Sequence, residues 1–223
     1  AGFGGLETDG FFGQATKNAL ARFQGAFGLT VDGVAGPETH RAILPWYTGY
    51  LVHTVRRGDT LSSIAALHGA SLEALTLANP GLQAENLRVG APVVVPLPFP
   101  VVPENISFSS ALVGYCVRGL GARYPFIVTG EAGKSVMGRP LWTMTLGQGE
   151  NRVLYNASHH ANEWITTPVL LRFAEELARA FAFGGELFGV SAGEILEYSS
   201  LCLVPAVNPD GIDLVTGELS AGE

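Results

Sequence analysis

The chain has 223 residues, a length typical of one or two domains. Hydrophobic residues make up 47% of the sequence, which is ample for packed cores and argues against a wholly disordered chain. The formal net charge is −7, from 13 basic and 20 acidic side chains, and no basic run stands out. This balance argues against nucleic acids and anionic membranes as partners and says nothing against a neutral glycan.

No apolar run approaches the roughly 20 residues that are needed to cross a bilayer, so we expect no membrane span. The sequence begins at Ala1 without a methionine and inside a motif, so we expect a fragment whose secretion signal could stand upstream. Cys116 and Cys202 both stand among apolar residues. They are consistent with two buried thiols or with one disulfide.

An internal repeat opens the chain, because residues 9–16 and 32–39 both fit the pattern D-G-x-x-G-x-x-T. In each copy Asp-Gly predicts a turn that tolerates positive φ, and the second glycine lets the chain enter a helix. Pro37 suits the first turn of the helix after the second copy. The apolar residues between the copies that share one helical face are Ala19, Leu20, Phe23 and Phe27.

These motifs resemble, in their order, the peptidoglycan-binding domain of cell-wall hydrolases. Residues 23–24, 28–29 and 32–33 supply the F-Q, G-L and D-G elements of that family. The resemblance implies a small three-helix-type bundle over residues 1–46 that binds peptidoglycan. The first helix of the family should precede residue 6, so we expect this domain to be incomplete at its N-terminus.

Residues 50–97 predict a second module with the order strand, helix, helix, strand. Residues 50–55 alternate apolar and polar side chains, which is typical of a short strand. Asp59 or Thr60 can cap the first helix, because short polar side chains accept hydrogen bonds from the free N–H groups of a first turn. Residues 87–96 indicate the returning strand.

The motifs in this module resemble the LysM family, which binds glycans that contain N-acetylglucosamine. Residues 55–65 read V-x-x-G-D-T-L-x-x-I-A, and N-P and L-x-V-G follow at residues 79–80 and 87–90. The resemblance implies a βααβ fold, with the glycan between the start of the first helix and the loop after the second. The alternative is that the residues at these two positions only cap the helices and form turns. The glycan-binding residues that the resemblance assigns are Gly58, Asp59, Thr60, Asn79, Pro80 and Gly81.

His40, His53 and His68 lie in these two modules, each isolated in a pattern that its neighbours explain. We expect structural roles for them rather than metal binding. Residues 98–106 are rich in proline and predict a semi-rigid linker, which marks the clearest domain boundary of the chain.

Residues 107–223 alternate long amphipathic helices with short apolar strands, which predicts an α/β domain with a central sheet. The expected helices are residues 109–122 and 169–181, and the expected strands are residues 126–129, 141–146, 153–156 and 201–207.

A histidine and a glutamate follow the strand at residues 153–156 and carry the chemistry of this domain. His160 and Glu163 are three residues apart, which places them on one face of a helix. Imidazole nitrogen and carboxylate oxygen are ordinary zinc ligands, and sites in α/β sheets commonly lie where strands end. The H-x-x-E pattern alone is weak, because a solvated histidine and a glutamate favoured by the helix dipole explain it more simply.

The surrounding sequence resembles the zinc carboxypeptidases. H-A-N-E-W-I-T at residues 160–166 matches the H-x-x-E-W-I-T motif of that family. G-R-P-L at residues 138–141 resembles an early strand, and N-P-D-G at residues 208–211 resembles a turn after a later one. The resemblance implies a mixed central sheet and a Zn²⁺ ion.

By this resemblance His160 and Glu163 are two of three zinc ligands, while His159 supports the site or simply packs. The turn residues expected beside the substrate are Asn208, Pro209, Asp210 and Gly211. In the family, arginines, a third ligand histidine and a glutamate base follow this turn. The twelve residues after Gly211 hold neither arginine nor histidine, so we expect the general base and third ligand beyond Glu223. A domain cut there leaves sheet edges and apolar faces open.

Wall-binding modules before this type of peptidase resemble the γ-D-glutamyl-meso-diaminopimelate peptidases. The resemblance implies a cell-wall metallopeptidase, extracellular or wall-associated and linked to sporulation, that binds glycan strands and cleaves stem peptides between D-Glu and meso-diaminopimelate. A non-catalytic wall-binding protein with a vestigial peptidase segment is the alternative, and a general carboxypeptidase is a weaker one.

Overall fold

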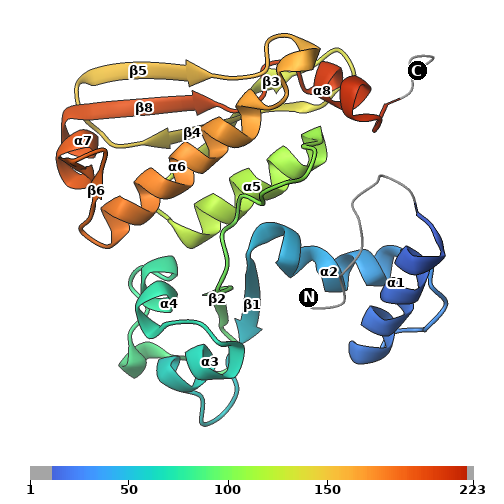
Figure 1. Ribbon diagram of the computed structural model, residues 1–223. Helices are drawn as coiled ribbons and strands as arrows, with labels where there is room; N and C mark the ends of the chain where they lie inside the picture. Colours follow the sequence, from blue (N-terminus) through green and yellow to red (C-terminus); the bar gives the residue numbers. More distant parts are fainter. Residues whose placement is uncertain (1–11, 220–223) are drawn as a thin grey trace. The chain divides into compact units, whose positions relative to one another are not determined.

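The computed structural model describes residues 12–219, which form two compact units divided between Tyr47 and Thr48 (Figure 1). The start of the first repeat, at residues 9–11, lies outside the described residues. Among the described residues no single helix is long and apolar enough to span a membrane, although the bent pair of helices at residues 61–68 and 72–78 passes together by length and composition.

The first unit contains helix α1 (Gln14–Ala26) and most of helix α2 (Pro37–Thr48), as two turn-and-helix repeats require. Ala19 and Phe23 are buried, as the helical spacing predicts, whereas Phe27 is 42% exposed. The ring of Phe27 nevertheless stacks on that of Phe23 at 4.4 Å. The aromatic face of α1 therefore forms the apolar core of the described part of this unit.

A buried glutamine fixes the second repeat. The side chain of Gln24 is 1% exposed, and its Oε1 accepts the backbone N–H groups of Asp32 and Gly33. Its Nε2 donates to the Asp32 carboxylate at 2.8 Å and to the Val34 carbonyl at 3.0 Å. Gly33 has φ of +68°, a conformation that glycine adopts without strain. The F-Q and D-G motifs are thus two halves of one hydrogen-bonded turn.

Within the second unit, residues 50–96 form the predicted strand–helix–helix–strand module. The two strands pair antiparallel, with Tyr50 opposite Pro96. Thr60 caps the first helix by accepting from the backbone N–H of Ser63, and Ser71 caps the second by accepting from Ala74. The elements are β1 (Tyr50–Thr54), α3 (Leu61–His68), α4 (Leu72–Ala78), the 3-10 turn η1 (Ala84–Asn86) and β2 (Pro92–Pro96).

The rest of this unit is a four-stranded mixed sheet in the order β3-β4-β8-β5, which confirms the predicted fold class. Strands β3, β4 and β8 pair antiparallel, and β5 pairs parallel with β8. The sequence pattern did not predict the short hairpin β6–β7 or helix α7. The elements are α5 (Ser110–Arg123), β3 (Val128–Lys134), β4 (Pro140–Leu146), β5 (Asn151–Asn156), the 3-10 turn η2 (Ala161–Glu163), α6 (Thr166–Ala182), β6 (Glu186–Leu187), β7 (Val190–Ser191), α7 (Ala192–Tyr198), β8 (Ser199–Val204) and α8 (Pro209–Thr216).

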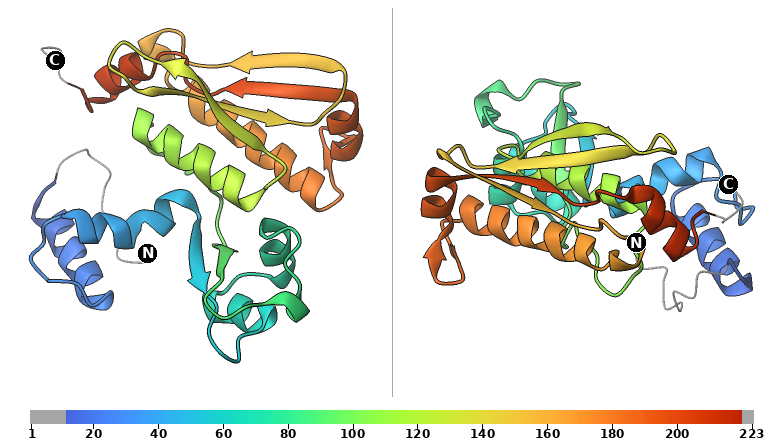
Figure 2. Two further views of the ribbon diagram at one scale, coloured as in Figure 1. Left: turned by 180° about the vertical axis from the view of Figure 1, so that it is seen from behind. Right: turned by 90° about the horizontal axis from the view of Figure 1, so that it is seen from above.

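Helices α5 and α6 cover one face of this sheet, as both views in Figure 2 show. Their apolar stripes and the inward residues of β4 and β8 form the main core, which includes Leu120, Met144, Leu177 and Leu203. On the edge strand β5, Leu154 is 61% exposed. The expected open edge and apolar exposure are therefore present in the described part of the chain.

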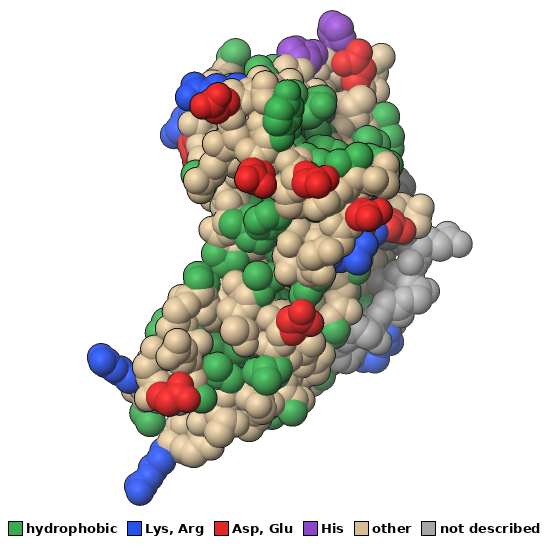
Figure 3. All heavy atoms as spheres, turned by 90° about the vertical axis from the view of Figure 1, so that its left-hand side faces the viewer, with side chains coloured by type: hydrophobic (Ala, Val, Ile, Leu, Met, Phe, Trp, Pro, Cys, Tyr) green, Lys and Arg blue, Asp and Glu red, His purple; other side chains and the backbone are tan. Residues whose placement is uncertain are grey.

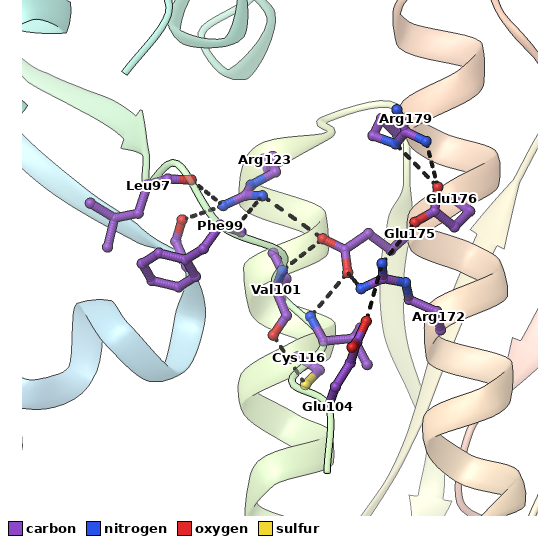
Figure 4. A network of polar contacts seen from close by, with 12 residues as sticks. Leu97, Phe99, Val101, Glu104, Cys116, Arg123, Arg172, Glu175, Glu176 and Arg179 are labelled. Carbon is purple, nitrogen blue, oxygen red and sulfur yellow. Dashed lines mark hydrogen bonds and ion pairs between the residues drawn. The ribbon is translucent and has the colours of Figure 1, made fainter. Parts of the chain in front are cut away.

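The proline-rich segment that was predicted as a semi-rigid linker contains two buried valines. Val101 and Val102 are 3% and 2% exposed and belong to the main core. Glu175 on α6 accepts both of their backbone N–H groups, and Arg123 on α5 binds carbonyls nearby (Figure 4). Tertiary contacts therefore hold this segment against the helices, which the composition of the segment alone does not reveal.

Both cysteines are free thiols. Cys116 is fully buried, and burial raises the pKa of its thiol. Cys202 is half-buried on β8. Of the two alternatives that the sequence left open, the structure has the unpaired thiols.

Candidate functional site

The candidate site is the loop that leaves the C-terminal end of β5. Ala157 continues the sheet register by donating its backbone N–H to the Val204 carbonyl. Ser158 then adopts φ of +53°, an uncommon conformation for a residue with a side chain. The turn η2 (Ala161–Glu163) follows, with His160 at its N-cap position. The expected helix is thus a single 3-10 turn, and it still brings the histidine and the glutamate together.

His160 and Glu163 are in direct contact. The Nδ1 of His160 lies 2.8 Å from the Glu163 Oε1, and the second carboxylate oxygen accepts the His160 backbone N–H at 3.2 Å. Hydrogen bonding to the His160 ring and backbone lowers the pKa of Glu163 below its ordinary value. The carboxylate is therefore ionised at neutral pH and suited to bind a cation.

The donor set fits a zinc ion. One imidazole and one carboxylate stand side by side, with side chains 78% and 45% exposed. Exposed histidine side chains are also visible beside acidic ones at the top of the surface in Figure 3. Within residues 12–219, no group of three or more His, Cys, Asp or Glu side chains is placed to hold a metal. The described residues thus supply a pair of donors and not the three protein ligands of a typical catalytic zinc site.

His159 points to a different partner. Its Nε2 lies 2.8 Å from the Oδ1 of Asn156 at the end of β5. That His160 rather than His159 is the metal ligand stays a prediction.

Two buried hydroxyls, which were not predicted from the sequence, join the loop to the core of the domain. Ser158 is 2% exposed, and its Oγ lies 2.7 Å from the Oγ1 of the fully buried Thr167 on α6. Thr167 donates to the Pro205 carbonyl after β8, so the Ser158 hydroxyl is the donor in the contact between the two hydroxyls. The hydroxyls therefore tie the loop to α6 and to the end of β8. Ser158 and Thr167 flank the H-x-x-E-W-I-T motif, but nothing in the local sequence marks them as partners of each other.

The N-P-D-G turn lies against the same loop. Asn208 accepts the Gly211 N–H through Oδ1 and donates through Nδ2 to the His159 carbonyl at 3.2 Å. A Cβ on Gly211 would lie 2.5 Å from the Asn208 Nδ2 and 3.0 Å from the Ala161 Cβ. Glycine at this position therefore permits the close approach of α8 to η2. Pro209 is buried in the first turn of α8.

Asp210 is occupied by contacts within the protein. Its Oδ1 accepts from Ser135 at 2.7 Å and from Arg139 at 3.1 Å, and its Oδ2 accepts the Met137 N–H. Although burial opposes it, hydrogen bonding to Ser135 and Met137 lowers the pKa of Asp210. Arg139 also donates to Asp213 at 2.6 Å. The G-R and N-P-D-G motifs are thus joined by a salt bridge, and contact of the turn with substrate stays a prediction.

The predicted glycan loop begins with Asp59, whose Oδ2 accepts the Arg56 N–H at 2.7 Å and lies 2.8 Å from the His53 Nε2. These two contacts, in that order, lower the pKa of Asp59. The Nδ1 of His53 in turn lies 3.0 Å from the Nε2 of His68. His53 and His68 thus have the structural roles that were expected, in a chain of contacts that the sequence did not reveal.

The second predicted glycan loop has a structural asparagine. The Asn79 side chain donates to the Leu75 and Val94 carbonyls and accepts the Val94 N–H at 2.9 Å. It therefore ties α4 to β2. Gly58, Thr60, Pro80 and Gly81 are exposed, and assignment of these residues to glycan binding stays a prediction.

Three family models match the chain. Residues 1–43 match the putative peptidoglycan binding domain, residues 53–96 the LysM domain, and residues 116–221 the zinc carboxypeptidase family. The three matches follow one another in the order that the motifs predicted.

Two of the relatives are bacterial proteins. The chain is 47% identical over 95 residues to the uncharacterized protein YqgT of Bacillus subtilis, which covers 41% of this chain and 25% of that protein. It is 38% identical over 107 residues to gamma-D-glutamyl-L-diamino acid endopeptidase 1 of Lysinibacillus sphaericus, which covers 48% of this chain and 27% of the relative. The chain therefore spans about a quarter of the length of these two relatives.

A solved carboxypeptidase-type structure, the bovine thrombin-activatable fibrinolysis inhibitor bound to a tick carboxypeptidase inhibitor, is also similar. The TM-score is 0.41 at 21% identity, with 48% of this chain and 33% of the other covered.

Proposed function

We propose that this chain is the wall-binding and metal-loop portion of a cell-wall metallopeptidase that hydrolyses the stem peptide of peptidoglycan between D-Glu and meso-diaminopimelate. The observation that carries the proposal is the His160–Glu163 pair, held beside the N-P-D-G turn in a chain that also has two wall-binding domains. The Lysinibacillus relative, by its name, acts on a γ-D-glutamyl–diamino acid bond. That name supports the bond and substrate proposed.

The residues of this chain have three tasks in the proposed reaction. His160 and Glu163 hold the metal, Asn208 positions the loop through the His159 carbonyl, and Ser158 fixes the loop from the core. A bound zinc ion supplies a Lewis acid that polarises the scissile carbonyl and activates water. The wall-binding domains raise the local concentration of stem peptide around this loop.

The proposed partners are the glycan strands, through the loops at residues 58–60 and 79–81, and the stem peptides. The wall-binding domains favour a place in the cell wall or outside the cell. A link to sporulation is proposed only from the resemblance to peptidases of spore-formers.

A non-catalytic wall-binding protein is the second candidate, and one observation favours it. The described residues bring two metal donors together rather than three. In that case the chain binds peptidoglycan and the peptidase segment has only a structural role.

The test uses purified muropeptides and zinc, with products identified by mass spectrometry, for the chain together with any sequence that continues it. The proposed function predicts cleavage between D-Glu and diaminopimelate, abolished by His160→Ala and retained in His159→Ala. Cleavage of ordinary peptides with no action on muropeptides would overturn the substrate. Wall binding with no cleavage in any of these proteins would support the second candidate.

A further inference from the structure

The segment between the LysM domain and the peptidase helices is seated in a polar clamp (Figure 4). Val101 and Val102 donate their backbone N–H groups to the two carboxylate oxygens of Glu175 at 2.6 and 3.0 Å. Glu175 lies in the middle of α6 and is 4% exposed. Both oxygens of a buried carboxylate are therefore committed to the backbone of this segment.

Arg123, at the C-terminal end of α5, completes the clamp. Its Nη1 donates to the Phe99 carbonyl at 2.8 Å, and its Nη2 donates to the carbonyls of Gly49 at 2.7 Å and Leu97 at 2.9 Å. Nη1 also lies 3.8 Å from the carboxylate of Glu175. Gly49 immediately precedes β1 and Leu97 immediately follows β2, and Tyr50 lies opposite Pro96, so one guanidinium holds the end of the LysM sheet where the chain enters and leaves.

Close packing supports the same attachment independently of these charges. A Cβ on Gly119 of α5 would overlap the Thr48 carbonyl oxygen, so the backbone that enters the LysM domain lies directly against α5. Leu77 on the LysM helix α4 packs against the main core of the peptidase segment. Apolar contact and backbone approach thus coincide with the polar clamp at the same junction.

We propose that Arg123 and Glu175 are positioning residues that hold the LysM domain in one fixed orientation on the peptidase segment. A flexible tether would only raise the local substrate concentration, whereas a fixed junction also selects which stem peptides along a bound glycan reach the loop. The preferred substrate is then polymeric peptidoglycan rather than free muropeptide. The substrate preference rests on the proposed function, whereas the fixed orientation of the LysM domain does not.

Distances between two spin labels, measured by double electron–electron resonance, test the clamp. Leu67 on α3 and Val169 on α6 are 67% and 66% exposed and accept labels after Leu67→Cys and Val169→Cys. Cys202→Ala removes the half-buried native thiol, while Cys116 is fully buried. The wild-type junction predicts one narrow distance distribution. In Glu175→Gln the side-chain NH₂ replaces one carboxylate oxygen, so the backbone N–H of Val101 or of Val102 loses its acceptor and faces a second donor. We therefore expect the width of the distance distribution to increase at least about twofold.

Glu176→Gln is the matched control, because Glu176 is the next residue of α6 and pairs only with Arg172 and Arg179 in its salt bridges. It should leave the distribution as narrow as in the wild type. Arg123→Lys keeps the charge but loses the planar fork that reaches three carbonyls, and it should broaden the distribution.

A broad wild-type distribution would overturn the proposal, and so would a Glu175→Gln distribution as narrow as that of the wild type. The wild-type measurement decides even where a variant fails to fold. Sedimentation of the same proteins with purified cell walls keeps the two proposals distinguishable. A narrow wild-type distribution in a protein that does not sediment would support the clamp and contradict the proposed function.

Discussion

At the scale of single residues, neighbours with the same chemistry have different tasks because of what they contact. His160 pairs with Glu163, whereas the adjacent His159 pairs with Asn156. The sequence predicted the first pair, because H-x-x-E-W-I-T is a local motif. It could not predict the Ser158–Thr167 contact, since both hydroxyls look ordinary until α6 folds back on the loop.

Zinc affinity should therefore separate the two histidines. We expect His160→Ala to weaken zinc binding by at least about tenfold, because loss of even an outer partner of a metal ligand commonly costs 10–100-fold. His159→Ala should change it by less than about twofold, as no donor of the pair is lost. Isothermal titration of zinc into each variant measures this. Equal effects of the two substitutions would contradict the assignment.

Gly211→Ala should destabilise the fold although alanine is the better helix former. The gain in helix propensity is about 1 kcal/mol, and forcing a methyl group against Asn208 and Ala161 costs about 1–3 kcal/mol. We expect a net loss of stability together with a shift of the loop that carries His160. Urea unfolding followed by circular dichroism measures the change.

Gly193→Ala in α7 is the matched control, since a Cβ there meets only the Ser191 Oγ at an ordinary 3.4 Å. It should stabilise the protein by up to about 1 kcal/mol. A stabilised Gly211→Ala protein would show that α8 and η2 do not approach each other as described.

At the scale of elements, the sequence predicted helix caps and turns, but it did not predict contacts between residues that are far apart along the chain. Thr60 and the Gly33 turn have the expected roles, because both act within a few residues of themselves. The Arg139–Asp210 salt bridge joins residues 71 positions apart, and nothing local marks either residue as the partner of the other. The same holds for the contact between His53 on β1 and His68 on α3, which are 15 positions apart.

The LysM domain should lose stability in acid through His68. Burial first, and the neighbouring His53 second, lower the pKa of His68, so the unfolded chain takes up its proton more readily than the folded one. The stabilising contribution is present above the ordinary histidine pKa of about 6.5 and is lost as the pH falls through the lowered folded value.

Thermal melting at about pH 7.5 and about pH 5 measures this contribution. His68→Gln retains a polar side chain and cannot titrate, so we expect its melting temperature to fall less over this interval than that of the wild type. An identical fall in both proteins would contradict a role for the protonation of His68.

At the scale of the whole molecule, the proposed function places wall binding and metal binding in separate segments of the chain. The two wall-binding domains should retain the chain on purified peptidoglycan even when the metal pair is removed, because no described residue of the loop at residues 158–163 belongs to them. We expect His160→Ala and the wild type to sediment equally with cell walls. Loss of binding in His160→Ala would mean that the loop itself holds the wall.

Under the proposed function these segments together serve cleavage of peptidoglycan at the bond after D-Glu. Product analysis by mass spectrometry, after incubation of purified cell walls with zinc and the chain together with any sequence that continues it, tests it most directly. We expect a new amino terminus on meso-diaminopimelate that disappears with His160→Ala. Cleavage at another bond, or a product that persists in His160→Ala, would contradict it.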